Sequence, residues 1–453
     1  MALQRDTIQT SSTTPQTFPM LVSLSTEGLK IDKRPPIDLV CVLDQSGSMY
    51  GEKIELLKNT FNYLLEYLQD FDRLSVITFS GEVSVIFPLT PTTQSNKEKL
   101  LHLIRTIQAA GSTDIYAGME KAFQILTRRE FKNPVSSIFL LSDGQDMMNY
   151  GRAAELVKHS LQELRVPKET SINTFGFGND HDSQLMTQIA NLREGGFYFI
   201  DQIDTIDEAF VDRLGGLMSS IAKDVQIKVK PEKSEVFPRI EIVKAYGDVS
   251  MWNFQEGIHT TTFANLLGGK RRDFVLELNV PETKTHVKSG ERIKVASVEV
   301  EILGFDNEKI ILEESLYVTL VNENEEFSNK EENNREVMKH FFRVKGAEFI
   351  EEARNLCENG LYSEAKELLK GFKEELENSE VKEEEFIQNL IKDIEIAIRD
   401  VDPVVYESSG KHNLLTNVNA QHFQTSNIYL NNAYLSDIQF QLAGEMRIRK
   451  LKK

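Results

Sequence analysis

The sequence predicts an α/β fold with a doubly wound, mostly parallel sheet, accompanied by an antiparallel β-sandwich and a C-terminal helical region. Three observations lead to this fold class. Strand-like and helical patterns alternate over residues 35–221, apolar and polar residues alternate with a period of two over residues 222–322, and helical spacing dominates residues 335–401. A chain of 453 residues also exceeds the usual size of one compact domain, so several domains are expected.

The α/β region begins with a continuous apolar run, IDLVCVL, at residues 37–43. A helical pattern follows from Ile54 to Leu68, and two strand-like runs meet at Ser80 and Gly81 in what reads as a hairpin. Helices and buried strands then alternate up to a predicted helix at residues 204–221. Continuous apolar strands separated by helices are typical of a parallel sheet covered on both faces, and such sheets form their sites at the carboxyl ends of the strands.

The segments outside this region are less regular. Residues 1–14 are rich in Thr, Ser and Gln and are expected to be disordered, whereas the strand within residues 15–34 is expected to join the β-sandwich. The α/β region would then be inserted within the sandwich. Residues 323–334 are predicted to be a charged linker, residues 335–401 three helices, and residues 402–453 a weakly patterned tail.

Composition excludes several classes of function. The net charge of −18 argues against binding to nucleic acid or to an anionic membrane surface, because both need clustered Lys and Arg. No stretch approaches the roughly 18 to 20 apolar residues of a membrane span, and the N-terminal residues lack the apolar core of a signal peptide. Two cysteines make neither a disulfide framework nor a Cys-rich zinc site. We therefore expect a cytoplasmic protein without a membrane span.

Oxygen-bearing side chains gather where the predicted strands end. Asp44 closes the first strand of the α/β region, and Ser46 and Ser48 lie on the loop that follows. Thr113 precedes a helix and Asp143 follows a buried strand. All five side chains offer oxygen and none offers nitrogen or sulfur, which is the ligand chemistry that Mg²⁺ prefers. The sequence therefore predicts a magnesium site, with two carboxylates to balance the charge of the ion.

Three other interpretations compete with this one. In an EF-hand loop that starts at Asp44, Met49 would occupy the position that requires glycine. In a phosphatase with Asp44 as nucleophile, Ser46 would occupy the position of the acid–base aspartate. The serines and Thr113 could also act only as helix N-caps. Capping explains each loop singly but not why three loops converge on two aspartates.

Two further acids flank the predicted site. Asp114 is expected to be a favourable charge at a helix N-terminus, and Asp146 is expected to be a solvated loop residue.

The motifs DQSGS and LLSDG, together with the threonine of GSTD, resemble the metal-ion-dependent adhesion site of von Willebrand factor A domains. The resemblance implies that Asp44, Ser46, Ser48, Thr113 and Asp143 hold Mg²⁺ or Mn²⁺. It also implies that the ion keeps an open position for an Asp or Glu of a partner protein. The β-rich segment after the α/β region, followed by residues 334–353 and the helices and tail beyond them, resembles the Vwaint region of A-domain proteins in plants and protists.

The expected function is a non-enzymatic, metal-dependent scaffold for protein–protein interaction. A multi-protein complex is one setting in which such a scaffold would act. Some relatives with this architecture carry a RING zinc finger and are taken as ubiquitin ligases, but this chain lacks the cysteines for a RING. The alternatives are therefore a component or adaptor of a ubiquitin ligase complex, or a magnesium-dependent phosphatase.

Overall fold

The computed structural model describes most of the chain. The described residues are 1–3, 7–9, 15–28, 34–143, 145–146, 148–178, 181–193, 195–200, 206–247, 251–282, 290–321, 334–424, 438–439 and 441–442. The linker predicted at residues 323–334 lies outside them, apart from Asn334. The chain forms two compact units. The sandwich unit comprises residues 1–26, 225–263 and 271–410, and the α/β unit comprises residues 27–224, 264–270 and 411–453.

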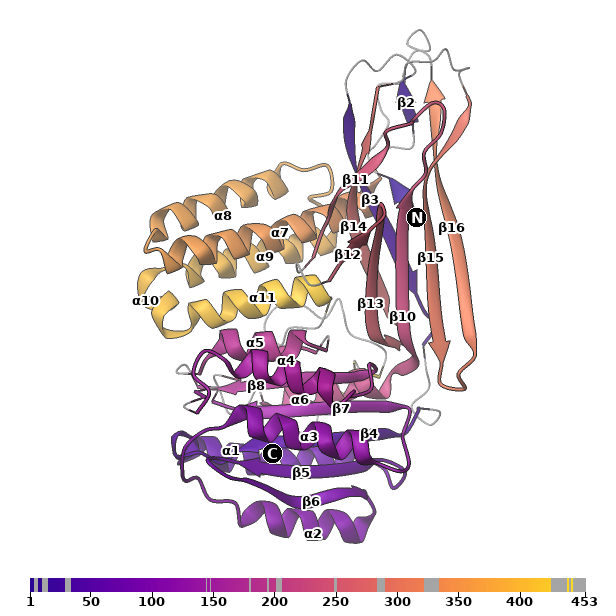
Figure 1. The fold of residues 1–453 in the computed structure, drawn as a ribbon. Helices are drawn as coiled ribbons and strands as arrows, with labels where there is room; N and C mark the ends of the chain where they lie inside the picture. The colour runs from indigo at the N-terminus through magenta and orange to yellow at the C-terminus, as the bar shows by residue number, and fades with distance from the viewer. Residues whose placement is uncertain are drawn as a thin grey trace. The chain divides into compact units, whose positions relative to one another are not determined.

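The α/β unit is built on a six-stranded sheet with the order β6-β5-β4-β7-β8-β9 (Figure 1). Its strands are β4 (Ile37–Asp44), β5 (Arg73–Phe79), β6 (Val83–Pro91), β7 (Val135–Ser142), β8 (Thr170–Phe177) and β9 (Phe197–Ile200). All neighbours pair in parallel except β6, which forms the predicted antiparallel hairpin with β5. The predicted fold class is confirmed.

Helices cover both faces of this sheet. They are α1 (Glu52–Tyr67), α2 (Gln94–Arg105), α3 (Ile115–Arg128), α4 (Ala153–Glu163), α5 (Ser183–Asn191) and α6 (Ile206–Met218). Ile138 of β7 belongs to a core with α3, α4 and α5. The next residue, Phe139, contacts the ring of Phe210 on α6 instead. Because successive strand residues point to opposite faces, α6 covers the face opposite to α3.

Buried ion pairs lie at the amino ends of β4 and β5. The Asp38 carboxylate, fully buried at the start of β4, accepts hydrogen bonds from Arg73 at 2.7 Å and 2.6 Å and from Arg129 at 2.7 Å. Arg34 makes a second paired contact with Asp72, at 2.9 Å and 2.5 Å. These guanidinium groups compensate carboxylates that would be costly to bury alone.

Helix α6 is shorter than the sequence predicts. The predicted helix extends to residue 221, whereas α6 ends at Met218 and strand β10 begins at Ser220. The Ser219 hydroxyl donates to the carbonyl of Gly215 at 2.7 Å, and its backbone N–H donates to the same carbonyl at 3.0 Å. The apolar spacing continues past the end of α6, because Ile221 fits a strand as well as a helix. Periodicity alone therefore did not reveal where the helix ends.

The sandwich unit contains two sheets, which are antiparallel except where β2 pairs with β16. The order of one is β1-β3-β14-β11 and that of the other is β12-β13-β10-β15-β16-β2. The strands are β1 (Ala2–Leu3), β2 (Thr7–Gln9), β3 (Gln16–Ser25), β10 (Ser220–Pro231), β11 (Glu241–Ala245), β12 (Asn253–Gln255), β13 (Ile258–Leu267), β14 (Arg271–Val280), β15 (Arg292–Gly304) and β16 (Lys309–Val321). Strand β3 pairs with β14 over its whole length, so segments from both sides of the α/β region share one sheet.

The expectation of disorder for residues 1–14 is wrong for the part that the structure describes. Leu3 in β1 pairs with Met20 of β3 and is only 3% exposed. Strand β2 pairs in parallel with β16, where Ile8 lies opposite Leu320. The hydrogen bonds between paired strands are made by backbone groups and do not depend on the side chains. The polar composition of residues 1–14 therefore did not prevent β1 and β2 from pairing with the edge strands of the two sheets.

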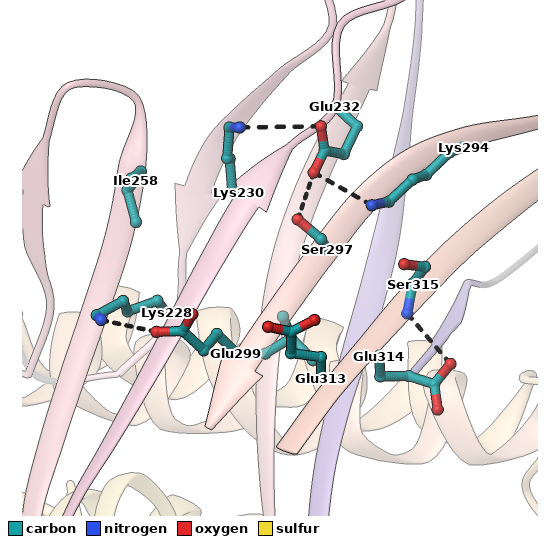
Figure 2. Close-up of a pocket in the computed structure, with 11 residues that line it drawn as sticks. Lys228, Lys230, Glu232, Ile258, Lys294, Ser297, Glu299, Glu313, Glu314 and Ser315 are labelled. Atoms are coloured by element: carbon teal, nitrogen blue, oxygen red, sulfur yellow. Dashed lines mark hydrogen bonds and ion pairs between the residues drawn. The ribbon is translucent and has the colours of Figure 1, made fainter. Parts of the chain in front are cut away.

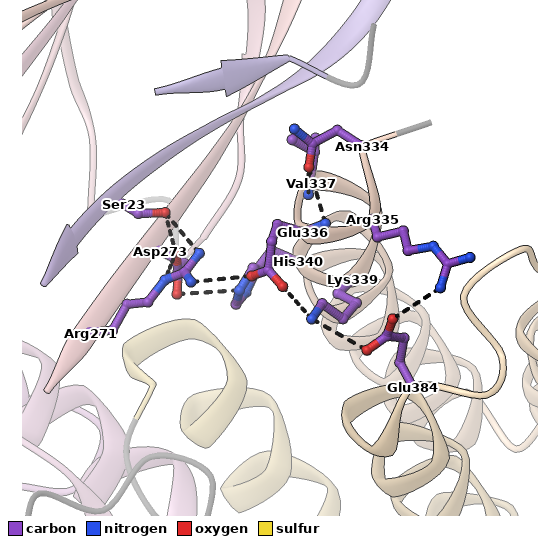
Figure 3. Close-up of polar contacts among 10 residues, drawn as sticks. All are labelled: Ser23, Arg271, Asp273, Asn334, Arg335, Glu336, Val337, Lys339, His340 and Glu384. Atoms are coloured by element: carbon purple, nitrogen blue, oxygen red, sulfur yellow. Dashed lines mark hydrogen bonds and ion pairs between the residues drawn. The ribbon is translucent and has the colours of Figure 1, made fainter. Parts of the chain in front are cut away.

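Helices α7 (Arg335–Glu358), α8 (Tyr362–Glu377), α9 (Glu385–Asp400) and α10 (Pro403–Val405) complete the sandwich unit. Helix α7 contacts β3 and β14. Figure 3 shows the polar contacts there: His340 Nε2 lies 3.3 Å from the Asp273 carboxylate, which also accepts from Arg271 at 2.8 Å. Burial, together with the charges of Arg343, Arg271 and Lys339, nevertheless lowers the pKa of His340 to about 2, so its imidazole is neutral.

Helix α11 (Lys411–Phe423) belongs to the α/β unit, where it contacts β9. None of the helices in the described part of the chain is both long enough and apolar enough to cross a bilayer.

Candidate metal centre

Three loops of the α/β unit are joined by backbone hydrogen bonds at the carboxyl ends of β4 and β7. Gly47 N donates to Gly111 O at 3.0 Å, and Ala110 N donates to Gln45 O at 2.7 Å. Met148 N donates to Thr113 O at 3.3 Å. The loop after β4, the loop before α3 and the loop after β7 are therefore held together by the main chain. These are the loops that carry the predicted site residues.

Asp44 is the most deeply placed of these residues. Its side chain is fully buried at the end of β4. One carboxylate oxygen accepts from Ser46 N at 2.8 Å, and the other accepts from the Ser142 hydroxyl at 2.5 Å. Burial raises the pKa of the Asp44 carboxyl to about 6, while the bonds from Ser142 and Ser46 oppose this shift. A cation nearby would stabilise the ionised form that burial disfavours.

The two serine hydroxyls face each other across the first loop. Ser46 Oγ and Ser48 Oγ are 3.1 Å apart, with Ser46 buried and Ser48 exposed. A short 3-10 helix, Gly47–Met49, connects them to the Gly51 N-cap of α1. Ser46 is the N-cap residue of the 3-10 helix, but its side chain makes no capping hydrogen bond there. The N-cap residue of α1 is Gly51 and neither of the serines. The capping alternative therefore fails for both serines.

Asp143 carries a buried carboxylate oxygen that calls for an explanation. Its side chain is fully buried, and its Oδ1 atom has no hydrogen-bond partner among the residues that the structure describes. Its Oδ2 atom accepts from Lys53 Nζ at 3.1 Å, and the Lys53 side chain is one-quarter exposed. A buried carboxylate oxygen without a partner costs free energy. A cation bound on this side of Asp143 would remove that cost.

The residues beside Thr113 are ordered by hydrogen bonds of their own. Thr113 is buried, and Asp114 caps α3 by accepting from Ala117 N at 2.9 Å, so the prediction for Asp114 is confirmed. The prediction for Asp146 is wrong, because its carboxylate is only 6% exposed. It accepts from Met148 N at 3.0 Å and from Asn149 N at 2.8 Å, and so shapes the loop after β7.

The donor set fits a hard divalent cation. Two carboxylates and three hydroxyls supply only oxygen, and Asp143 Oδ1 is free to bind. In the described part of the chain, no group of three or more His, Cys, Asp and Glu side chains could hold a metal. An ion at this site would therefore depend on hydroxyl ligands. Sequence reasoning missed Lys53 and Ser142, both of which bond to the aspartates, although Ser142 lies within the motif LLSDG and Lys53 follows DQSGS by five residues.

The sandwich unit holds a different hollow, of about 290 Å³, on the sheet that contains β10 and β15 (Figure 2). Its lysines are already ion-paired: Lys228 with Glu299 at 2.7 Å, and Lys294 with Glu232 at 3.4 Å. Lys230 also lies 3.9 Å from Glu232. Lysines and glutamates neutralise each other across this surface, so the hollow favours neither an anion nor a cation.

Comparisons with known proteins agree with the fold described above. Residues 38–210 match the family model of the von Willebrand factor type A domain. The chain is 26% identical over 255 residues to the E3 ubiquitin-protein ligase WAV3 of Arabidopsis thaliana, an alignment that covers 56% of this chain and 32% of that protein. It is 26% identical over 211 residues to the uncharacterized protein YfbK of Escherichia coli (strain K12), covering 46% and 36% of the two chains. The chain thus spans about a third of the length of these relatives.

A solved structure supports the fold. The von Willebrand factor type A protein from Catenulispora acidiphila superposes with a TM-score of 0.66 at 15% identity, covering 93% of this chain and 95% of that one. At this level of identity the likeness shows the fold alone.

Proposed function

Residues 38–210 form a von Willebrand factor type A domain, and we propose that this domain binds Mg²⁺ and, through the ion, an acidic side chain of a partner protein. Domains of this family are typically interaction modules, which favours a scaffold over an enzyme. The observation that carries the proposal is the buried Asp143 Oδ1 atom, which has no hydrogen-bond partner within the described part of the chain and lies among predicted ligands that all offer oxygen.

Each side chain has a separate task in this proposal. Asp44 and Asp143 balance the charge of the ion, while Ser46, Ser48 and Thr113 supply neutral oxygens. Neutral ligands leave the bound ion electrophilic, so that it attracts an Asp or Glu carboxylate of a partner. Ser142 and the Ser46 N–H hold the Asp44 carboxylate in place through the two hydrogen bonds given above. Mn²⁺ has the same preference for oxygen ligands and would substitute for Mg²⁺.

Isothermal titration of the full chain with MgCl₂ tests this proposal, with Asp143→Asn as the site variant and Asp114→Asn as the control. Asparagine preserves the N-cap of α3, because Asn and Asp cap helices about equally well. We expect Asp114→Asn to bind Mg²⁺ as the unmodified chain does and Asp143→Asn to lose binding. Retention of Mg²⁺ binding by Asp143→Asn would exclude the site.

A second candidate function is that of an adaptor within a ubiquitin ligase complex. The match to WAV3, which is named as an E3 ubiquitin-protein ligase, covers 56% of this chain and favours this candidate. The two cysteines of these 453 residues, Cys41 and Cys357, are both buried and too few for a RING zinc site, so in this proposal these residues contribute binding and not the RING itself. Co-purification of the tagged chain with a RING protein in the presence of Mg²⁺, and its loss in EDTA, would support the adaptor role.

A further inference from the structure

Strand β16 leaves much of one edge of its sheet open. Strand β15 pairs with β16 over residues 309–319, and β2 pairs with it on the opposite side only at residues 319–321 (Figure 1). In the described part of the chain, residues 309–318 of β16 therefore pair with a strand on one side only. An edge strand of this kind presents backbone N–H and C=O groups to which another strand can bind.

The open stretch also exposes aliphatic side chains. Ile310, Ile311 and Leu312 follow one another, and their exposed fractions are 49%, 51% and 48%. Because side chains alternate between the two faces of a strand, Ile310 and Leu312 share the face of the buried Leu316, and Ile311 lies on the other face. The stretch is therefore apolar on both faces. A long exposed edge of this composition favours pairing with another chain.

Two residues of opposite charge flank these aliphatic residues. Lys309 precedes them and Glu313 follows them, both on the same face as Ile311. The Lys309 ammonium lies 3.0 Å from the Glu301 carboxylate, yet 53% of the Lys309 side chain is exposed. Glu301 also has Lys228 at 3.3 Å, so it keeps a cationic partner if Lys309 turns away. The segment KIILE thus ends in a positive charge on one side and a negative charge on the other.

An antiparallel second copy of this segment is complementary to it. Directly opposite residues lie on the same face of a sheet, so the two-fold axis of such a pair passes through a residue position and not between two positions. With the axis at Ile311, Lys309 lies opposite Glu313 of the second copy on both sides of the axis. Ile310 then lies opposite Leu312. Moving the axis by one residue in either direction places Ile311 opposite Lys309 or Glu313, so charge and apolarity together select one register.

We propose that two copies of this chain associate through residues 309–313 of β16, which pair antiparallel about a two-fold axis at Ile311. The pairing joins the two sheets into one and covers the three aliphatic side chains with those of the second copy. A pairing this short buries less surface than an obligate dimer interface does, so the association is reversible and increases with protein concentration. The proposal is independent of the metal centre and stands whether or not that centre binds Mg²⁺.

Charge reversal tests this register by sedimentation velocity of the full chain over a range of protein concentrations. Lys309→Glu and Glu313→Lys each place like charges opposite each other on both sides of the axis. Either variant alone should raise the dissociation constant of the dimer about tenfold. An equimolar mixture of the two variants restores opposite charges across the axis and should form heterodimers about as readily as the unmodified chain forms homodimers. Recovery in the mixture also shows that both variants are folded.

Ile311→Lys places two ammonium groups at the axis and should abolish the dimer. Val243→Lys is the matched control, because Val243 is 49% exposed and lies on β11 of the other sheet; it should leave the dissociation constant unchanged. The proposal is overturned if the unmodified chain is monomeric at every concentration, or if its dimer survives Ile311→Lys. Failure of the mixed variants to form heterodimers, or equal weakening by Val243→Lys, would also overturn it.

Discussion

Replacing Asp143 with asparagine distinguishes two roles of its carboxylate, that of a metal ligand and that of a structural ion pair with Lys53. If Mg²⁺ binds only the folded α/β unit, ion at 100 times its dissociation constant stabilises that unit by about 2.7 kcal/mol. Asparagine keeps one oxygen but removes the charge. If this weakens binding about 100-fold, the same Mg²⁺ concentration contributes only about 0.4 kcal/mol. Without Mg²⁺ the variant loses the negative charge that pairs with Lys53 Nζ at 3.1 Å. Because Lys53 reaches water, this loss costs only about 1 kcal/mol.

The assay is urea unfolding of the full chain, followed by tyrosine fluorescence, with Mg²⁺ and with EDTA. The Mg²⁺-dependent gain should nearly vanish in Asp143→Asn and persist in Asp114→Asn. The reasoning is refuted if Asp143→Asn gains as much from Mg²⁺ as the unmodified chain, or if neither chain gains anything.

Three further predictions concern stability and are all measured by urea unfolding. Asp38→Asn leaves the Arg129 guanidinium, which is 2% exposed, without its charged partner. The free energy of unfolding should therefore fall by about 3–5 kcal/mol. A decrease of less than about 1 kcal/mol would contradict the buried pair. Gly118→Ala places a Cβ atom 3.0 Å from Phe79 and should lower the free energy of unfolding by about 1–3 kcal/mol. In Gly371→Ala, the matched control, the new Cβ atom meets open space, and the free energy of unfolding should rise by up to about 1 kcal/mol. The folded pKa of His340 is about 2, below the unfolded value of about 6.5, so the unfolded state binds more protons as the pH falls. The contribution of the neutral His340 imidazole to the free energy of unfolding should therefore be complete above pH 6.5 and decrease by up to about 1.4 kcal/mol per pH unit below it. If the free energy of unfolding of His340→Gln falls equally steeply with decreasing pH, this imidazole is not the cause.

The sequence was most informative about the loops of the candidate metal centre. Asp44 ends β4 and Asp143 follows β7, because buried apolar runs and the residues that end them can be read directly from the chain. The partners of these aspartates could not be read in the same way. Lys53 looked like any exposed helix residue, and only the three-dimensional packing of α1 brings its ammonium to Asp143.

Features that depend on long-range packing were also beyond the sequence. Periodicity predicted the strands of the sandwich unit, yet it placed the end of α6 three residues too late, since Ser219–Ile221 fit either pattern. The polar segment around Gln439 gave no apolar repeat of its own. Its burial depends on Asp212 and Gly215, more than 200 residues earlier in the chain.

Crystals of the full chain grown with MnCl₂ test the central claim most directly, because manganese scatters anomalously. We expect an anomalous difference peak within coordination distance of Asp143 Oδ1 and of the Ser46 and Ser48 hydroxyls, abolished by Asp143→Asn. A well-ordered loop cluster without a peak at saturating manganese would contradict the proposed metal centre.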